Sequence, residues 1–423
     1  MKKNKSKAQA TGLLYAQSGG VTAAINSSAK GALEAAVAAD RGRVLAGSNG
    51  ILGVLEEELV DVRACGSRQL AQLRNLPGGA FGSCRYKLPD PHQDPRPYQR
   101  IADVFRAHQI GSFLYNGGND SQDTTSKIAA FCKSAGVPVA CVGIPKTIDN
   151  DLVRTDCCPG FGSAAKYIAT SVAECALDVA SMARTSTKLF VIEVMGRDAG
   201  WLTAAAGLAG EADSPIMLLL PEVPFAATKF VRAIRQRVSQ HGYCIVACSE
   251  GVRNARGELL ASRGGADAFA HVQLGGAGSV VAQLAKEKLG LKYHLAIADY
   301  MQRAARHLAS RTDLDQAEAL GKAAAQWALA GHGGVMASVR RLADSPYRWK
   351  VEAVPLASVA NRVRQVPKTF ISADGFSITA AARRYMQPLI SGEDWPPFRA
   401  GLPVHRLPRR RLVARRLGAW KRK

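Results

Sequence analysis

The residues that could most readily take part in catalysis form one short run, Gly143 to Asp151, with the sequence Gly-Ile-Pro-Lys-Thr-Ile-Asp-Asn-Asp. The run follows an apolar stretch and places Lys146 close to two carboxylates, Asp149 and Asp151. A lysine can offset phosphate charge while one carboxylate accepts a proton and another helps to hold a metal ion. The run therefore suits transfer of a highly charged group, and the competing interpretation is a polar surface turn.

Two other predicted junctions between a strand and a loop carry similar polar residues. Upstream lies Gly117-Gly118-Asn119-Asp120-Ser121, and downstream lies a loop that contains Arg197. Asn119 can offer a carbonyl oxygen to Mg2+, or it can serve as an Asx turn or helix cap. Arg197 can hold a phosphate or a carboxylate with its planar guanidinium group.

Three further segments are candidates for the same site. Gly19 and Gly20 lie between a predicted strand and helix, where free backbone N–H groups can bind a phosphate, although the loop matches neither a Walker A nor a dinucleotide motif. Glu250, at the end of another apolar run, can accept hydrogen bonds from sugar hydroxyls. The segment 300–303, Tyr-Met-Gln-Arg, is either part of the site or an ordinary amphipathic stretch.

Short apolar runs alternate with longer helical stretches, which predicts an α/β fold with mostly parallel sheets covered by helices. Ligands of such folds bind beyond the carboxyl ends of the strands, where the polar loops lie. We expect strands at 12–16, 43–47, 110–115, 137–142, 189–194, 216–220, 243–248 and 294–298. We expect helices at 22–39, 121–135, 162–183, 229–240, 279–289 and 313–330, the last capped by Thr312 or Asp313.

Composition narrows the class of protein. The chain has 423 residues, room for two domains, and no apolar run that could span a bilayer, so we expect no membrane association. Its nine cysteines form an odd set without CxxC spacing, which favours a cytoplasmic location.

The net charge of +22 would suit nucleic acid, but the basic residues are densest in the tail after Pro408 and aromatic residues make up only 6%. We therefore expect no nucleic-acid partner and a tail that is solvated or contacts a partner. A basic nucleic-acid-binding or regulatory protein is the minor hypothesis.

In order from about residue 12 to about residue 340, these motifs resemble those of the phosphofructokinase family, most specifically GIPKTIDND and MGRDAGW. The resemblance implies two Rossmann-like, doubly wound domains, a cytoplasmic enzyme of glycolysis and carbohydrate metabolism, and Mg2+ as the metal. It also implies phosphoryl transfer to the C1 hydroxyl of fructose 6-phosphate, and it favours a homodimer.

Two positions bear on the phosphoryl donor. ATP-dependent members usually carry GGDGS and GIPGTIDND, whereas this sequence has GGNDS and a lysine in place of the glycine, as pyrophosphate-dependent members do. Asp120 would project charge and bulk toward the α-phosphate of a nucleotide, and Lys146 would stabilise pyrophosphate as it is cleaved. We expect a reversible enzyme that uses pyrophosphate, with an ATP-dependent 6-phosphofructokinase as the alternative.

The resemblance also implies residue roles. Asp149 would be the proton acceptor, with Asp151 as the alternative base; Lys146 and Asp120 would act on the donor; Gly19 would contact pyrophosphate. Asn119, which replaces the family's usual aspartate, would be a Mg2+ site, and Arg85 would bridge the two phosphates. The sugar phosphate would be bound by a larger set: Thr147, Ile148, Asp149, Met195, Gly196, Arg197, Glu250, Tyr300, Met301, Gln302 and Arg303.

The expected domains follow from the same match. Residues 10–162, with about 304–340, would bind the donor and Mg2+, and residues 163–303 would bind the sugar phosphate. Residues 341–423 would form a C-terminal extension with a basic tail, to which we assign no role.

Overall fold

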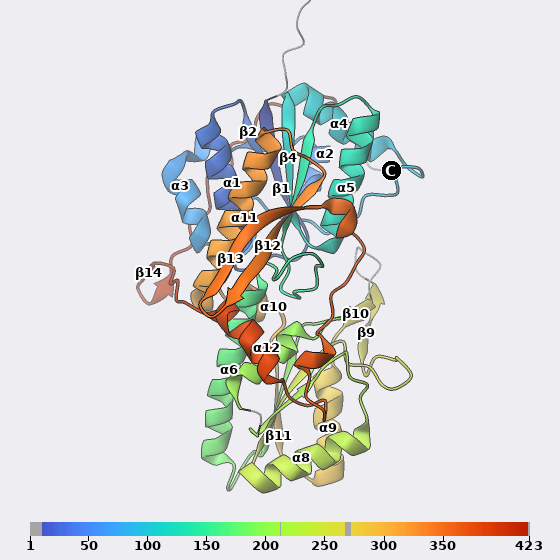
Figure 1. The fold of residues 1–423 in the computed structure, drawn as a ribbon, viewed down its shortest axis with the longest axis vertical. Coiled ribbons are helices and arrows are strands. Elements are labelled where there is room, and N and C mark those ends of the chain that lie inside the picture. The colour runs from blue at the N-terminus through green and yellow to red at the C-terminus, as the bar shows by residue number, and fades with distance from the viewer. Residues whose placement is uncertain (1–10, 212, 267–271, 422–423) are drawn as a thin grey trace, which may run out of the picture.

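The computed structural model describes residues 11–211, 213–266 and 272–421. Its main elements are two sheets, each with helices on both faces (Figure 1). The larger sheet has the strand order β13-β12-β5-β4-β1-β2-β3, and the smaller has the order β11-β6-β8-β7. The predicted α/β class is therefore confirmed.

The larger sheet is parallel except at its edges, where β3 and β13 pair antiparallel with their neighbours. Successive side chains of β1, an interior strand of this sheet, enter different cores: Leu13 and Tyr15 pack on one face, and Leu14 and Ala16 pack on the other. A strand buried on both faces needs such a continuous apolar run. The strands are β1 (Gly12–Gln17), β2 (Val44–Gly47), β3 (Leu59–Asp61), β4 (Ile110–Gly117), β5 (Ala140–Pro145), β12 (Val335–Asp344) and β13 (Tyr347–Pro355).

Helices α1 (Ile25–Ala39) and α11 (Arg311–Leu329) cover one face of this sheet, and α2 (Ile51–Leu55), α4 (Arg96–His108) and α5 (Asn119–Ser134) cover the other. The contact between α1 and α11 is unusually close. A Cβ atom at Gly31 would lie 2.0 Å from the carbonyl oxygen of Glu318, and one at Gly321 would lie 2.0 Å from that of Ser28. Glycine at both positions lets the two backbones approach each other.

The smaller sheet is entirely parallel and is built from β6 (Leu189–Val194), β7 (Ile216–Leu219), β8 (Cys244–Ser249) and β11 (Tyr293–Ile297). Helices α6 (Phe161–Met182) and α7 (Trp201–Ala206) pack on one face, and α8 (Ala227–His241) and α9 (Ala277–Leu289) pack on the other. A short hairpin of β9 (Ser262–Ala266) and β10 (Val272–Leu274) lies apart from both sheets.

The chain crosses from the larger sheet to the smaller through residues 146–160, and it returns through α10 (Asp299–Ala304) to α11. Asp313 joins the two crossings. Its carboxylate accepts hydrogen bonds from Gly160 N at 2.9 Å, from Ser163 N at 3.0 Å and from Ser163 Oγ at 2.5 Å. The cap of α11 is Ser310, because its backbone is extended and its Oγ accepts from Asp313 N. The predicted caps, Thr312 and Asp313, already lie inside the helix, so that prediction was wrong.

The C-terminal region is part of the fold. Strand β13 belongs to the larger sheet, and α12 (Ala380–Met386) lies between the part of the molecule built on the larger sheet and the part built on the smaller sheet (Figure 1). After a small hairpin of β14 (Phe398–Arg399) and β15 (Leu402–Pro403), the basic tail runs along the edge strand β3. Asp61 N donates to Arg411 O at 2.8 Å, and Val413 N donates to Leu59 O at 2.9 Å. The prediction of a solvated or partner-contacting tail is therefore wrong for its backbone, because peptide groups at the sheet edge pair with it.

Between β3 and α4 the chain forms one more α-helix, α3 (Gly66–Gln72).

Across the described ranges, no helix combines the length and the apolar character that a membrane crossing requires.

Replacing Asp313 with alanine tests the joint between the crossings. The change would leave the N–H groups of Gly160 and Ser163 buried without an acceptor, so we expect the free energy of unfolding to fall by about 3 kcal/mol. Chemical denaturation measures this loss. Asp103→Ala, which removes an exposed ion pair with Arg106 and an exposed hydrogen bond from Gln99, is the control and should cost at most about 1 kcal/mol. Equal stability of the two variants would contradict the assignment.

Candidate active site

Four loops meet between the two sheets, and each follows a parallel strand. They come after β1, β4, β5 and β6, so they lie at the carboxyl edges where α/β folds bind ligands. They border one cavity of about 490 Å3. Its lining is formed by Gly19, Gly20, Val21, Thr22, Arg85, Gly118, Asn119, Asp120, Ser121, Lys146, Thr147, Ile148, Asp149, Asp151, Met195, Arg197, Asp198, Ala199, Glu250, Arg303, Asn361 and Val363.

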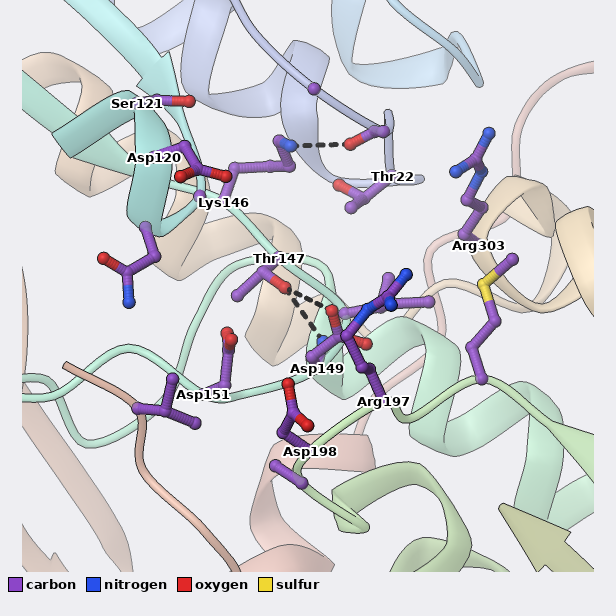
Figure 2. A pocket seen from close by; sticks show the side chains of 18 of the residues that line it. Thr22, Asp120, Ser121, Lys146, Thr147, Asp149, Asp151, Arg197, Asp198 and Arg303 are labelled. Atoms are coloured by element: carbon purple, nitrogen blue, oxygen red, sulfur yellow. Dashed lines mark hydrogen bonds between the residues drawn. The ribbon is translucent and has the colours of Figure 1, made fainter. Parts of the chain in front are cut away.

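Figure 2 shows how charge is divided within the cavity. Asp120, at the start of α5, and Lys146 lie toward one end with Thr22. Asp149 and Arg197 lie toward the other, and Arg303 approaches from α10. Each end of the space thus holds at least one cation and one carboxylate, and the space is large enough for a small phosphorylated ligand.

The loop after β1 is shaped for close approach by its neighbours. Gly19 has a positive φ of 72°, and its N–H donates to Cys84 O at 3.0 Å. A Cβ atom at Gly20 would lie 2.6 Å from a guanidinium nitrogen of Arg303. The second glycine therefore makes room for an arginine that comes from a distant part of the chain.

Lys146 is the buried cation of the site, with 3% of its surface exposed. Its Nζ donates a hydrogen bond of 2.6 Å to Gly20 O, which ties the loop after β5 to the loop after β1. Burial, together with the positive charges of Arg303 and Arg85, lowers the pKa of Lys146 to about 7 against the opposing effects of Asp149 and Asp151. Because a bound anion would favour the charged form, this amine is suited to receiving phosphate.

Asp149 is held in place by its own loop. Thr147 Oγ donates to Asp149 Oδ2 at 3.2 Å and accepts from Asp149 N at 3.0 Å. Burial raises the pKa of Asp149, while the hydrogen bond from Thr147 and the nearby Lys146 and Arg197 oppose the rise. The carboxylate is thus a stronger base than an exposed aspartate and has a fixed direction.

Asp151 has fewer hydrogen-bond partners than Asp149. Burial raises its pKa, and the negative charge of Asp149 raises it further, against the effect of Arg364. Its Oδ1 atom is buried and accepts no hydrogen bond in the structure. Two neighbouring buried carboxylates do not both carry charge readily, which separates their roles.

The far end of the cavity combines an acid with arginines. Glu250 Oε1 accepts from Gly196 N at 3.4 Å, and burial raises the pKa of Glu250 to about 7. A Cβ atom at Gly251 would lie 2.0 Å from Arg197 O, so the loops after β6 and β8 are in close contact.

Most of the residues that the sequence singled out are brought to this cavity. Gly196 lies beside its lining through the bond to Glu250, whereas Gln302 is buried and accepts from Met195 N at 3.3 Å. Tyr300 and Met301 are 61% and 59% exposed and do not border the cavity. Their predicted contact with the sugar phosphate stays a prediction.

The structure also brings in residues that the sequence did not assign. Asp198 lies within the MGRDAGW motif, and Thr22 and Ser121 lie shortly after the glycines of the loops that follow β1 and β4. Their proximity to these motifs could have predicted that they border the cavity. Asn361 and Val363 come from beyond the matched region and carried no such signal.

A model of the family described as Phosphofructokinase matches residues 13–328. The chain belongs to the phosphofructokinase family. Its match to that model covers the loops after β1, β4, β5 and β6, which border the cavity.

Similar proteins extend over nearly the whole chain. The pyrophosphate--fructose 6-phosphate 1-phosphotransferase of Methylococcus capsulatus is 55% identical over 92% of this chain and 94% of its own. The protein of the same name from Xanthomonas campestris pv. campestris is 53% identical over 96% and 98%. A crystal structure of a pyrophosphate-dependent phosphofructokinase from Nitrosospira multiformis has a TM-score of 0.90 and 47% identity, covering 97% of this chain and 100% of that one. These relatives include the segment after residue 340.

The burial of Lys146 predicts a pH dependence of anion binding. A lysine whose pKa is lowered to about 7 is charged below that pH and loses its proton as the pH rises through it. With pyrophosphate as the probe, the association constant of the wild type relative to Lys146→Met should fall by up to about tenfold per pH unit above about pH 7. Calorimetric titration at several pH values measures this ratio, in which the ligand's own titration cancels.

Lys133→Met, which changes a lysine in the last turn of the same helix as Asp120, is the matched control. Its ratio to the wild type should not vary with pH. A ratio for Lys146→Met that is likewise constant would contradict the lowered pKa.

Proposed function

We propose that the protein transfers a phosphoryl group from pyrophosphate to the C1 hydroxyl of D-fructose 6-phosphate. The products are fructose 1,6-bisphosphate and phosphate, and the reaction runs in both directions in glycolysis and gluconeogenesis. The observation that carries this proposal is the presence of Asp120, Lys146 and Asp149 on one cavity in a chain 52–55% identical to proteins named for this activity.

Asp149 is the proposed base. It accepts the proton of the C1 hydroxyl as that oxygen forms a bond to phosphorus, and the bond between phosphorus and the bridging oxygen of pyrophosphate breaks to release phosphate. Its burial makes it basic, and the two contacts with Thr147 direct it. In the reverse direction the protonated Asp149 returns the proton to the leaving hydroxyl.

Lys146 and the glycine loop bind the donor. The ammonium group, already aimed into the loop after β1, offsets charge as it gathers on the released phosphate. Gly19 and Arg85 both line the cavity. Gly19 would bring its backbone close to the donor, and Arg85 would bridge the phosphates of the two substrates. Asp120 borders the same end and would repel the α-phosphate of a nucleotide.

The sugar phosphate would lie at the opposite end, against Arg197, Arg303 and Glu250, with Met195 and Ile148 as apolar walls. We infer that the half built on the larger sheet binds the donor and that the half built on the smaller sheet binds the sugar phosphate. Arginine forks suit a phosphate monoester, and the carboxyl group of Glu250 suits hydroxyls.

We infer that Mg2+ accompanies the donor. Mg2+ is usually held by one or two carboxylates together with substrate phosphates, and Asp151 offers a buried oxygen without a hydrogen-bond donor. Asp120 faces the same cavity. Within the described ranges, no group of three or more His, Cys, Asp or Glu residues is placed so that it could hold a metal ion by itself. When bound, the ion would neutralise phosphate charge. Asn119 remains a predicted ligand.

The proposal includes a cytoplasmic homodimer. All nine cysteines are free thiols, which suits a reducing compartment. Leu177 on α6 and Tyr300 and Met301 on α10 expose large apolar side chains in the half with the smaller sheet, as a surface buried against a second copy would.

Asp120→Gly tests how the donor is selected. Removing the carboxylate should raise kcat/KM for ATP by about tenfold or more, because like charges in contact cost several kcal/mol. Initial rates with ATP and with pyrophosphate, at saturating fructose 6-phosphate, give the result. Asp120→Asn keeps the size of the side chain but removes its charge, so it separates steric exclusion of ATP from electrostatic repulsion. Wild-type turnover with ATP but not with pyrophosphate would refute the proposed donor.

Asp149→Ala tests the base. We expect kcat to fall by about 10²- to 10⁴-fold with affinity for fructose 6-phosphate nearly unchanged, because only proton transfer is lost. Steady-state kinetics and equilibrium binding measure the two effects. Asp151→Asn is the matched variant and should retain more activity; the opposite order would assign the base role to Asp151.

A further inference from the structure

The C-terminal segment of residues 360–366, which we call the strap, crosses the edge of the cavity. Asn361 and Val363 both border it, although they lie more than 200 residues along the chain from the loops after β1, β4 and β5. Asn361, at φ 59°, adopts a left-handed conformation that asparagine tolerates better than most residues. The strap therefore forms part of the cavity wall. Because its backbone bends at Asn361, contacts with the rest of the chain must hold it in this conformation.

The strap is firmly fixed at both ends. Before it, Leu356 and Val359 are buried in a small apolar cluster. After its tip, Arg364 N donates to Asp151 O at 2.7 Å, and the Arg364 guanidinium donates to Asn150 O at 2.8 Å. The same guanidinium lies 4.9 Å from the ring centre of Trp201. These contacts hold the strap against the loop that carries the catalytic aspartate.

Between these ends, the tip is held by the first turns of α5. Asn361 N donates to Asn119 Oδ1 at 2.7 Å, and Asn119 Nδ2 donates to Arg362 O at 2.6 Å. Asn361 Nδ2 also donates to Asp123 Oδ1 at 3.1 Å. Positions 119 and 123 lie one above the other on the helix, so a single face of α5 binds the tip.

Asparagine at position 119 suits both contacts of this clamp. A carboxamide offers both an acceptor and a donor, and here each is used by the strap backbone. An aspartate could still accept from Asn361 N, but it would direct a charged acceptor at Arg362 O. The departure from the family's usual aspartate thus coincides with the strap contact.

We propose that Asn119 is a positioning residue that clamps the strap across the donor end of the cavity, and that the clamped strap restricts the size of the donor. The inference rests on the proposed pyrophosphate-dependent activity. Asp120, the next residue, faces the cavity while Asn119 holds the wall beside it. Pyrophosphate ends at its second phosphate, whereas a nucleotide extends beyond and must displace this wall or go around it.

The experiment compares Asn119→Asp and Asn119→Ala with the wild type in two assays. Steady-state kinetics gives KM for pyrophosphate and for fructose 6-phosphate, together with the ratio of kcat/KM for ATP and pyrophosphate. Limited trypsin digestion of the full chain, followed by mass spectrometry, gives the rate of cleavage after Arg362. That rate reports release of the tip without depending on which donor is used.

We expect both variants to raise KM for pyrophosphate and the rate of cleavage after Arg362 by about tenfold, as the loss of one or two hydrogen bonds predicts. KM for fructose 6-phosphate should stay within about twofold, because the opposite end of the cavity is untouched. The preference for pyrophosphate over ATP should fall in both variants. Lys368→Ala, an exposed change in the same region outside the clamp, should match the wild type in both assays.

Asn119→Asp decides between the clamp and a metal role. If Asn119 served only as a Mg2+ ligand, the aspartate would keep or lower KM for pyrophosphate and leave cleavage unchanged, and that result would overturn the proposal. Asp123→Ala removes the third hydrogen bond of the clamp, together with an ion pair to Lys127 within α5, and should speed cleavage less. No change in cleavage in all three variants would also overturn the proposal. A wild type that uses ATP alone would refute the proposed function while the digestion still tests the clamp.

Discussion

The structure depends on holding one buried lysine and two partly buried aspartates close together within a single loop. Lys146, Asp149 and Asp151 follow β5 at the point where the chain leaves the larger sheet. Burial lowers the pKa of the lysine and raises the pKa of both aspartates, so it favours the neutral form of each. Such a group is stable only with opposing charges and fixed hydrogen bonds around it. The loop after β1, the arginines at 197, 303 and 364 and the hydroxyl of Thr147 supply them. The two-sheet architecture brings these distant segments together.

Much of the fold was predictable because it follows from local pattern. The central strands are continuous apolar runs and the long helices are amphipathic, so β1, β4 and β6 and helices α6 and α11 were placed within a few residues. Edge elements were missed: β3 is three residues long, and β13 alternates exposed and part-buried residues in an antiparallel edge pair. Helix α4 follows a long irregular stretch that obscured its start.

The site was predictable to the extent that motifs carry it. The loops with glycine, aspartate and arginine lie where polar residues follow apolar strands, and the rule for parallel sheets brings them to one edge. The strap could not be predicted, because the contact between Asn119 and residues 361–362 joins segments 242 and 243 positions apart through backbone atoms. No residue type in the strap signals that contact. The sequence predicted Asn119 as a Mg2+ site, or as an Asx turn or helix cap, and its contact with the strap became clear only from the geometry.

Running the reaction in reverse tests whether this enzyme exchanges its phosphoryl group with phosphate and not with a nucleotide. The protein would be supplied with fructose 1,6-bisphosphate, phosphate and Mg2+ in the absence of any nucleotide, and phosphorus NMR would follow the products. The account predicts that pyrophosphate and fructose 6-phosphate form in equal amounts. No pyrophosphate under these conditions, with ATP formed once ADP replaces phosphate, would contradict it.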